Sequence, residues 1–141
     1  MHIAFALFAD AANISQEGKL NILGVFDALQ VAQLPAVHPR ATLVVRVKGT
    51  AVDVGAHSLG MAWVGPNSNE LWGSQGQLDV GTPPNGVNEL DFPIIAALDL
   101  PLDATGAYTM KLALDGNPAA EIKLMVRAAP ALPRTTPGLV S

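Results

Sequence analysis

The three histidines, His2, His38 and His57, are the only imidazoles that this sequence offers for acid–base, nucleophilic or metal chemistry. Only His57 has another candidate ligand within four residues, because Asp53 lies four positions before it. That spacing brings two ligands together on a helix, but it separates them on a strand or in a loop. The sequence therefore predicts no metal site at the histidines.

Nucleophiles and phosphate loops are missing from the sequence as well. No serine stands in a GxSxG elbow, and Ser58 points to the face of its strand opposite His57. The chain has no cysteine and therefore no thiolate or disulfide. The glycines of GSQGQ, residues 73–77, lie inside a strand pattern and indicate a bulge or close packing rather than a phosphate loop. We expect neither enzyme activity nor a cofactor.

Two carboxylates, Asp99 and Asp103, flank the short loop LPL. Similar loops bind calcium in some β-sandwiches, and Asp53 or Asp79 could add a ligand. Calcium takes about six to eight oxygens, more than these residues supply. We favour carboxylates that accept backbone N–H groups in turns, and a weak metal site remains the alternative.

Two tryptophans, Trp63 and Trp72, oppose each other across a hairpin if the turn GPNSNE is centred between them. Three polar side chains lie near this pair: Asn67, Asn69 and Gln75. An exposed pair would form a platform for stacking sugars, whereas a buried pair would be a core contact. Leu59 and Met61 share its face, so we expect burial.

A single carboxylate, Asp10, interrupts the apolar stretch FADAANISQEGKLNILGVF. The stretch fits a hairpin with a three-residue loop that ends at Gly18 with positive φ. Counting outward from that loop places Asp10 opposite Gly24, where a carboxylate can lie across the partner strand or another segment can approach. We expect Asp10 to be structural, accepting backbone N–H groups or pairing with Arg40 or His38.

The opposite face of this hairpin is also apolar. Its members are Ile3, Phe5, Leu7, Leu23 and Val25. One face would meet a second sheet, and the other would need a crossing loop, the C-terminal tail or a second subunit. The hairpin therefore predicts self-association, with Phe5, Leu7, Leu23 and Val25 at the interface.

These residues lie on strands, because apolar residues alternate with period two along the chain between turn residues. We predict an all-β fold, a two-sheet antiparallel β-sandwich. Its topology, whether immunoglobulin-like, C2-like or jelly-roll, stays open. Pro93 places its strand at an edge or a bulge. The pattern gives about eight strands, at residues 3–14, 20–31, 41–49, 56–65, 70–80, 89–99, 107–114 and 119–128.

The length of 141 residues fits a single domain. We assign it to residues 1–128 and expect residues 129–141, which are rich in proline, to form a flexible tail. A second proline-rich segment, LPAVHPR at residues 34–40, is expected to cross between the two sheets.

Charge and hydropathy limit the partners and the location. The net charge is −4 and the eight basic residues are scattered, which argues against nucleic acid. No apolar run approaches the ~20 residues of a membrane span, and the apolar start lacks the basic residues of a signal peptide, so we expect a cytoplasmic protein. Only 14% of residues are charged, against ~25% in typical soluble domains, which favours an apolar surface that meets a partner.

Three stretches carry a resemblance to a known family. They are ALFADAANISQEGKLNILGVFDAL, then LPAVHPR, and finally LPLDATGAYTMKLALDGN. They resemble an uncharacterised family of small bacterial β proteins with a domain of unknown function. Its members open with A-D-A and G-K-L-x-I-x-G and close with G-x-Y-x-x-x-L-x-x-D-G. The resemblance covers most of residues 4–126, excludes residues 49–88, and implies a compact β domain without assigned catalytic residues.

The function that we predict is that of a noncatalytic structural or interaction module. It would present a sheet face or edge to a second copy or to a protein partner. The alternative is a small-ligand or carbohydrate-binding sandwich that uses Trp63 and Trp72. A hydrolase or a metal enzyme is the least favoured of the three interpretations.

Overall fold

The structure of the protein is a computed structural model, which describes residues 1–130. These residues form nine strands and a short 3-10 turn, η1 (Ala51–Asp53), between β4 and β5. The strands are β1 (His2–Ile14), β2 (Leu20–Phe26), β3 (Ala28–Val31), β4 (Ala36–Thr50), β5 (Gly55–Val64), β6 (Glu70–Val80), β7 (Glu89–Leu102), β8 (Gly106–Leu114) and β9 (Asn117–Ala128).

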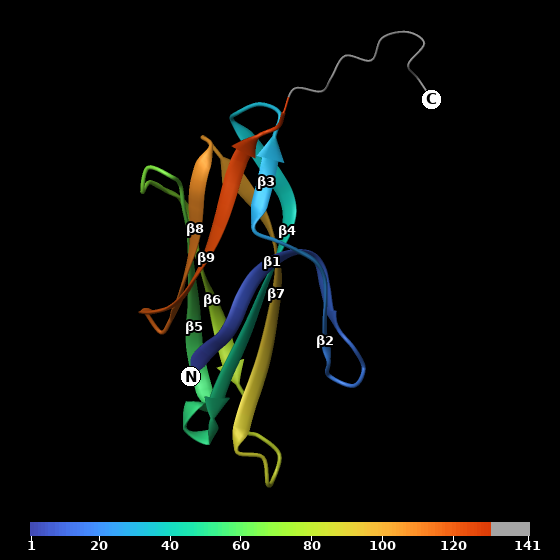
Figure 1. Cartoon of the computed structure of the whole chain (residues 1–141). Helices are drawn as coiled ribbons and strands as arrows, with labels where there is room; N and C mark the ends of the chain where they lie inside the picture. The colour runs from blue at the N-terminus through green and yellow to red at the C-terminus, as the bar shows by residue number, and fades with distance from the viewer. Residues whose placement is uncertain (131–141) are drawn as a thin grey trace, which may run out of the picture.

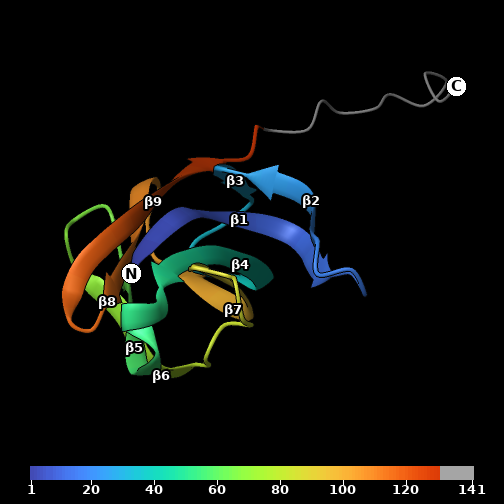
Figure 2. The ribbon, with the colours of Figure 1, turned by 90° about the horizontal axis from the view of Figure 1, so that it is seen from below.

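The strands form two sheets that pack face to face, as predicted (Figures 1 and 2). The four-stranded sheet has the order β2-β1-β4-β7, and the five-stranded sheet has the order β3-β9-β8-β5-β6. All pairs are antiparallel except β3 and β9, which are parallel. The predicted antiparallel β-sandwich is confirmed, and the short parallel pair of β3 and β9 is a feature that the prediction did not include.

The predicted strand at residues 20–31 is two strands in different sheets. It breaks at Asp27, whose carbonyl accepts a hydrogen bond of 2.9 Å from the Met125 N–H. The chain returns to the four-stranded sheet over residues 32–35, so the predicted crossover at residues 34–40 is mostly the first part of β4. A register shift between His38 and Ala41 separates that part from the predicted strand at residues 41–49.

The core lies between the sheets and follows the predicted alternation. The hairpin β8–β9 turns its apolar residues inward and its charged residues outward, with Met110 opposite Ile122 and Lys111 opposite Glu121. The largest fully buried side chains include Trp63, Tyr108, Phe8, Leu43, Leu100 and Leu124. Pro93 lies on β7, which is an edge strand as predicted.

The hairpin β1–β2 extends beyond the rest of the sandwich. β1 pairs with β4 only as far as Ala9, which lies opposite Thr42. Beyond Ala9 it pairs with β2 alone. Both views show this extension, residues 10–24, on the side of the four-stranded sheet that faces away from the five-stranded sheet (Figures 1 and 2). We call residues 10–24 the arm.

The sandwich ends close to the predicted boundary at residue 128. The Ala129 N–H donates to the Val31 carbonyl at 2.8 Å, one residue beyond β9. The remainder of the predicted flexible tail, residues 131–141, lies outside the described residues. Over residues 1–130 the structure contains no helix with the length and apolar character needed to cross a membrane.

Candidate interaction surface

The loop at the tip of the arm has the predicted three-residue geometry. The Gly18 N–H donates to the Ser15 carbonyl at 2.9 Å, and the Ser15 N–H donates to the Lys19 carbonyl at 2.8 Å. Gly18 has φ +82°, which a glycine adopts without steric strain. The predicted register follows, with Phe8 opposite Phe26 and the intervening residues paired in order.

Asp10 and Gly24 meet at the base of the arm. Gly24 has φ +72°, and a Cβ placed on it would lie 2.3 Å from Oδ2 of Asp10. The carboxylate thus lies across the partner strand, in the space that the missing side chain leaves, as the sequence predicted. Glycine is required at position 24 for two reasons, its positive φ and the close contact with the Asp10 carboxylate.

The expected hydrogen bonds of Asp10 are not formed. Its side chain is exposed, and no group of residues 1–130 donates to the carboxylate. Arg40 instead gives its backbone N–H to Asp99 at 3.0 Å, and the His38 ring packs against Phe26 with centroids 5.5 Å apart. The prediction failed because β4 is irregular at Arg40, where φ is +53° and the N–H points to β7.

The predicted interface residues share the outer face of the four-stranded sheet. Phe5 lies opposite Arg46 and Leu7 opposite Val44. On the arm side, Val25 lies opposite Ala9. Ile3, which was predicted on this face, packs against the core instead, because a bulge between Ile3 and Phe5 shifts the register.

Two further residues, Val44 and Ile95, complete this face, and the sequence analysis did not find them. They pair with each other, and Val44 also pairs with Leu7. The sequence feature that indicates these two residues is a pair of adjacent apolar residues in each strand, Val44-Val45 and Ile94-Ile95. Such a pair places one apolar residue on each face of the strand. The outer apolar face consists of Phe5, Leu7, Leu23, Val25, Val44 and Ile95.

Exposure is uneven across the outer apolar face. Leu23 and Val25 are 71% and 60% exposed, Phe5, Leu7 and Ile95 are half-buried, and Val44 is fully buried by its neighbours. The two most exposed residues lie on β2, the edge strand. The accessible apolar area therefore increases toward the arm.

Paired charges border one end of this face. The guanidinium of Arg46 forms an ion pair with Asp91, and Lys48 Nζ lies 3.2 Å from Glu89 Oε1. The hydrogen bond from Arg46 holds the pKa of the Asp91 carboxyl below its ordinary value. The charges at this border neutralise one another, so the face has little local net charge.

One face of the arm is apolar. It carries Ala12, Ile14, Leu20 and Ile22. Ile14 is 47% exposed, and the other three are half-buried. At the tip, the chain is polar, and Lys19 and Glu17 form an exposed ion pair of 3.3 Å. The other face of the arm carries Asn13 and Asn21, whose side chains share a hydrogen bond of 2.9 Å, together with Leu23. Only one face of the arm is therefore apolar.

The tryptophans form a core contact. Trp63 and Trp72 are directly opposed, as predicted. Trp63 has 0% exposure, stacks on Tyr108 with centroids 5.2 Å apart, and donates its Nε1–H to the Pro101 carbonyl at 2.9 Å. Trp72 is half-buried and packs against the core. A sugar platform needs two exposed rings, so this pair does not provide one.

The polar residues expected near the tryptophans have other positions. Asn69 donates its amide to Asp103 at 3.1 Å, Asn67 is exposed in the turn, and Gln75 lies on the outer face of the five-stranded sheet. They do not gather around a ring. The structure gives no support to the carbohydrate alternative at these residues.

Asp99 and Asp103 act as loop carboxylates. The Tyr108 hydroxyl lies 2.8 Å from Asp103 Oδ1 and accepts the backbone N–H groups of Asp103 and Ala104. The hydrogen bond from Tyr108 lowers the pKa of Asp103. Residues 1–130 contain no group of three ligands suited to a metal ion. The tyrosine fastens the loop before β8, a role that the sequence analysis missed.

His57 is held between two oxygens at one end of the sandwich. Its Nδ1 lies 2.6 Å from Asp115 Oδ2, and its Nε2 lies 2.5 Å from the Asp53 carbonyl. Both partners are acceptors, so the ring satisfies both only as an imidazolium. The hydrogen bond to Asp115 raises the pKa of His57, and that of Asp115 is lowered in turn. Because both nitrogens are hydrogen-bonded, the ring links η1, β5 and the β8–β9 turn.

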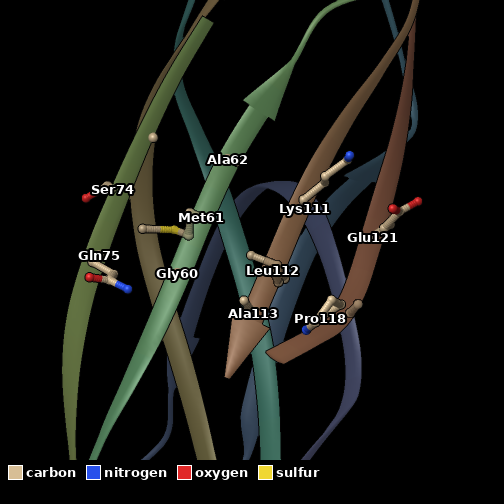
Figure 3. A pocket seen from close by; sticks show the side chains of 12 residues that line it. Gly60, Met61, Ala62, Ser74, Gln75, Lys111, Leu112, Ala113, Pro118 and Glu121 are labelled. Carbon is tan, nitrogen blue, oxygen red and sulfur yellow. The ribbon is translucent and has the colours of Figure 1, made fainter. Parts of the chain in front are cut away.

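A hollow of about 570 Å³ lies on the outer face of the five-stranded sheet (Figure 3). Gly60, Ala62 and Ala113 form its floor, and Gln75 and Glu121 stand at its sides. A Cβ on Gly60 would lie 3.6 Å from the Ala113 Cβ, so the floor is closely packed. Every buried side-chain nitrogen and oxygen of residues 1–130 has a hydrogen-bond partner, so no buried polar group is left unpaired at the hollow.

The fold and this surface define a β-sandwich with an apolar outer face and a projecting arm. The chain belongs to a family of unknown function, DUF6941, whose model matches residues 4–127. The family predicted from the opening and closing motifs is thus confirmed as one without an assigned function. No curated protein matches the chain.

Proposed function

We propose that this protein is a noncatalytic interaction module that associates with a second copy through the outer apolar face. The observation that carries the proposal is the gathering of Phe5, Leu7, Leu23 and Val25, from two strands, next to Val44 and Ile95. Soluble monomers seldom leave a contiguous apolar face of this kind open to water.

The state of the polar groups supports the absence of catalysis. His57 has both ring nitrogens engaged, and Asp103 accepts hydrogen bonds on both carboxylate oxygens. A general base needs a free nitrogen or oxygen beside a substrate site. Asp10 is free but stands alone at the base of the arm, without a neighbouring acid, base or nucleophile.

Sedimentation velocity over a range of concentrations tests the proposal. We expect the mass of the native protein to rise with concentration. Val25→Lys should weaken self-association by about 100-fold, because it buries an unpaired ammonium. Val52→Lys is the matched control, since Val52 is 90% exposed in η1, away from this face, and it should associate like the native protein.

A monomer mass at every concentration would contradict the proposal. Equal loss of association in both lysine variants would also count against it, because the effect would then reflect net charge rather than this face.

A further inference from the structure

The two sheets differ by one strand, and β6 is the strand without a counterpart. The Trp63 Nε1–H on β5 donates to the Pro101 carbonyl on β7, so these two strands face each other. β1 also contacts β9 across the sandwich. β7 is the last strand of its sheet, whereas β5 has β6 beyond it. No strand within residues 1–130 therefore covers the inward face of β6.

Side chains on this side of the sandwich are incompletely covered. Phe92 and Ile94 point inward from β7 and are half-buried. Their partners on β4, Val47 and Val45, are at most 1% exposed. The cover is therefore lost at β7, on the side away from β4. We call the inward faces of β6 and β7 the open side, with the residues Trp72, Ser74, Gly76, Leu78, Phe92 and Ile94.

Two small residues leave room on the inward face of β6. Gly76 lies opposite the buried Leu59, so Gly76 and Ser74 point inward, yet both are exposed. A Cβ placed on Gly76 would have no atom within 4 Å. Trp72 and Leu78 flank the two small residues and are half-buried. Large apolar side chains of another segment would fill this space and cover both flanking residues.

The edge of β7 offers main-chain groups to such a segment. Pro93 lies opposite Arg46 in the ladder with β4 although it has no N–H, so the main-chain groups at this position point away from β4. Alternation then turns the N–H and C=O groups of Ile95 and Ala97 toward the free edge. A strand added beside β7 would hydrogen-bond to these groups and would lie opposite β6.

The edge strands of a second copy do not match this place. β6 would bring its own small residues, Ser74 and Gly76, and would leave the space empty. β7 would bring Pro93, which cannot donate to a ladder. β3 has only four residues, and the φ of +72° at Gly24 interrupts the extended backbone of β2. A segment of another polypeptide therefore fits better than a second copy.

Carboxylates border the open side and favour a basic segment. Glu70 and Asp79 lie at the two ends of β6, and neither forms an ion pair within residues 1–130. The guanidinium of Arg46, which lies beside β7, is already paired with Asp91. Lysine or arginine at the ends of a bound segment would complement the free carboxylates, whereas acidic residues would be repelled.

We infer that the open side binds an extended segment of another protein, which pairs with β7 as a fifth strand and places apolar side chains over Ser74 and Gly76. The segment has large apolar residues at every second position and basic residues at its ends. This surface is separate from the outer apolar face, because Ile94 points inward from β7 and Ile95 outward. The inference thus goes beyond the proposed self-association.

A synthetic peptide of this chemistry tests the inference. It carries valine or isoleucine at every second position, threonine between them and a lysine at each end. Fluorescence anisotropy of the labelled peptide should show saturable binding to the full-length protein. A peptide of the same composition with its apolar residues in one block should bind about tenfold more weakly, because it cannot present them on one face.

Two valine variants of neighbouring residues on β6 test the position. Gly76→Val fills the open space with a side chain and should weaken binding of the peptide by about tenfold or more. Gln77→Val is the matched control, since Gln77 lies opposite Ser58 on the outer face, and it should bind like the native protein. Equal affinity in Gly76→Val and the native protein would overturn the inference.

Two variants of one residue on β7 test the strand pairing. Ala97→Pro removes an N–H from the free edge and should weaken binding by about tenfold, whereas Ala97→Val keeps the N–H and should bind like the native protein. Circular dichroism checks that both variants are folded. Native affinity in folded Ala97→Pro would overturn the pairing with β7 and with it the inference.

The remaining outcomes separate this inference from the proposed function. Val25→Lys should bind the peptide like the native protein, because Val25 lies on the outer apolar face. A monomeric native protein that binds the peptide would support this inference and contradict the proposed function. No saturable binding up to about 1 mM would overturn the inference. A lower mass of Gly76→Val in sedimentation would also overturn it, because a second copy would then occupy the open side.

Discussion

The hairpins β1–β2 and β8–β9 are built from the same alternation of residues and end in different surroundings. In β8–β9 both strands have a second neighbour, since β8 pairs with β5 and β9 with β3. In β1–β2, β2 pairs with β1 alone. The hairpin β8–β9 therefore lies inside a sheet, whereas β1–β2 ends in an edge strand and extends beyond the sheet.

The difference shows in what each hairpin places on its outward face. β8–β9 carries Lys111, Glu121, Lys123 and Arg127 there, as a solvated sheet does. β1–β2 carries Phe5, Leu7, Leu23 and Val25. The inward residues of β8–β9 stabilise the fold, whereas the apolar residues of the arm have no partner within the described sandwich and are available for association.

The largest expected effect is a loss of stability that occurs in β8–β9 and not in β1–β2. Leu124→Ala removes a fully buried side chain from β9 and should lower the free energy of unfolding by about 2–5 kcal/mol. Leu23→Ala, at 71% exposure on β2, should change it by less than about 0.5 kcal/mol and weaken self-association instead. Urea unfolding and sedimentation of both variants check this, and similar unfolding losses would remove the distinction.

A smaller loss of stability is expected from substitutions of the two glycines of the arm, Gly18 at its tip and Gly24 at its base. Gly18→Ala meets open space and carries only the penalty of a positive φ, about 1–2 kcal/mol. Gly24→Ala adds a clash with Asp10 and should lower the free energy of unfolding by about 1 kcal/mol more. Asp10→Ala alone should change it by less than about 0.5 kcal/mol, since the carboxylate is exposed and lacks a donor.

The double variant Asp10→Ala/Gly24→Ala isolates the contact between the two residues. Removing the carboxylate should restore the excess loss, so that the double variant is as stable as Gly18→Ala. Additive losses, measured by urea unfolding, would show that Gly24 is required for its φ alone.

The smallest effect is a pH dependence of stability at the end of the sandwich that holds the β8–β9 turn. The pKa of His57 is raised above its ordinary 6.5, so its contribution to stability is present below about pH 6.5 and is lost as pH rises through the higher folded value. The pKa values of Asp53 and Asp115 are lowered below 3.8, so their contributions are present above about pH 4 and are lost as pH falls. Stability should be greatest between about pH 4 and 6.5.

Urea midpoints measured across this range check the direction. His57→Gln should remove the decline on the alkaline side, because it cannot become charged. The arm contains no histidine, so self-association should change little between about pH 5 and 8. A decline that persists in His57→Gln would assign the pH dependence to other groups.

Much of the sandwich was predictable from local pattern. The loop at Gly18, the register of Phe8 with Phe26 and the burial of Trp63 against Trp72 follow from turn chemistry and alternation. The break at Asp27 was not predictable, because the residues on either side continue the same alternation while they enter different sheets. Ile3 was assigned to the wrong face because a bulge shifts period two without a sequence signal as strong as Gly or Pro.

The sequence by itself determined which residues alternate, where the hairpins turn, and that the first hairpin has two apolar faces. Only the tertiary structure decided that β2 is an edge, that Val44 and Ile95 join Phe5 and Leu7, and that Arg40 bonds to Asp99 rather than to Asp10. The physical reason is the range of the interactions. Alternation and turns depend on neighbours along the chain, whereas edges, faces and ion pairs depend on strands that are distant in sequence.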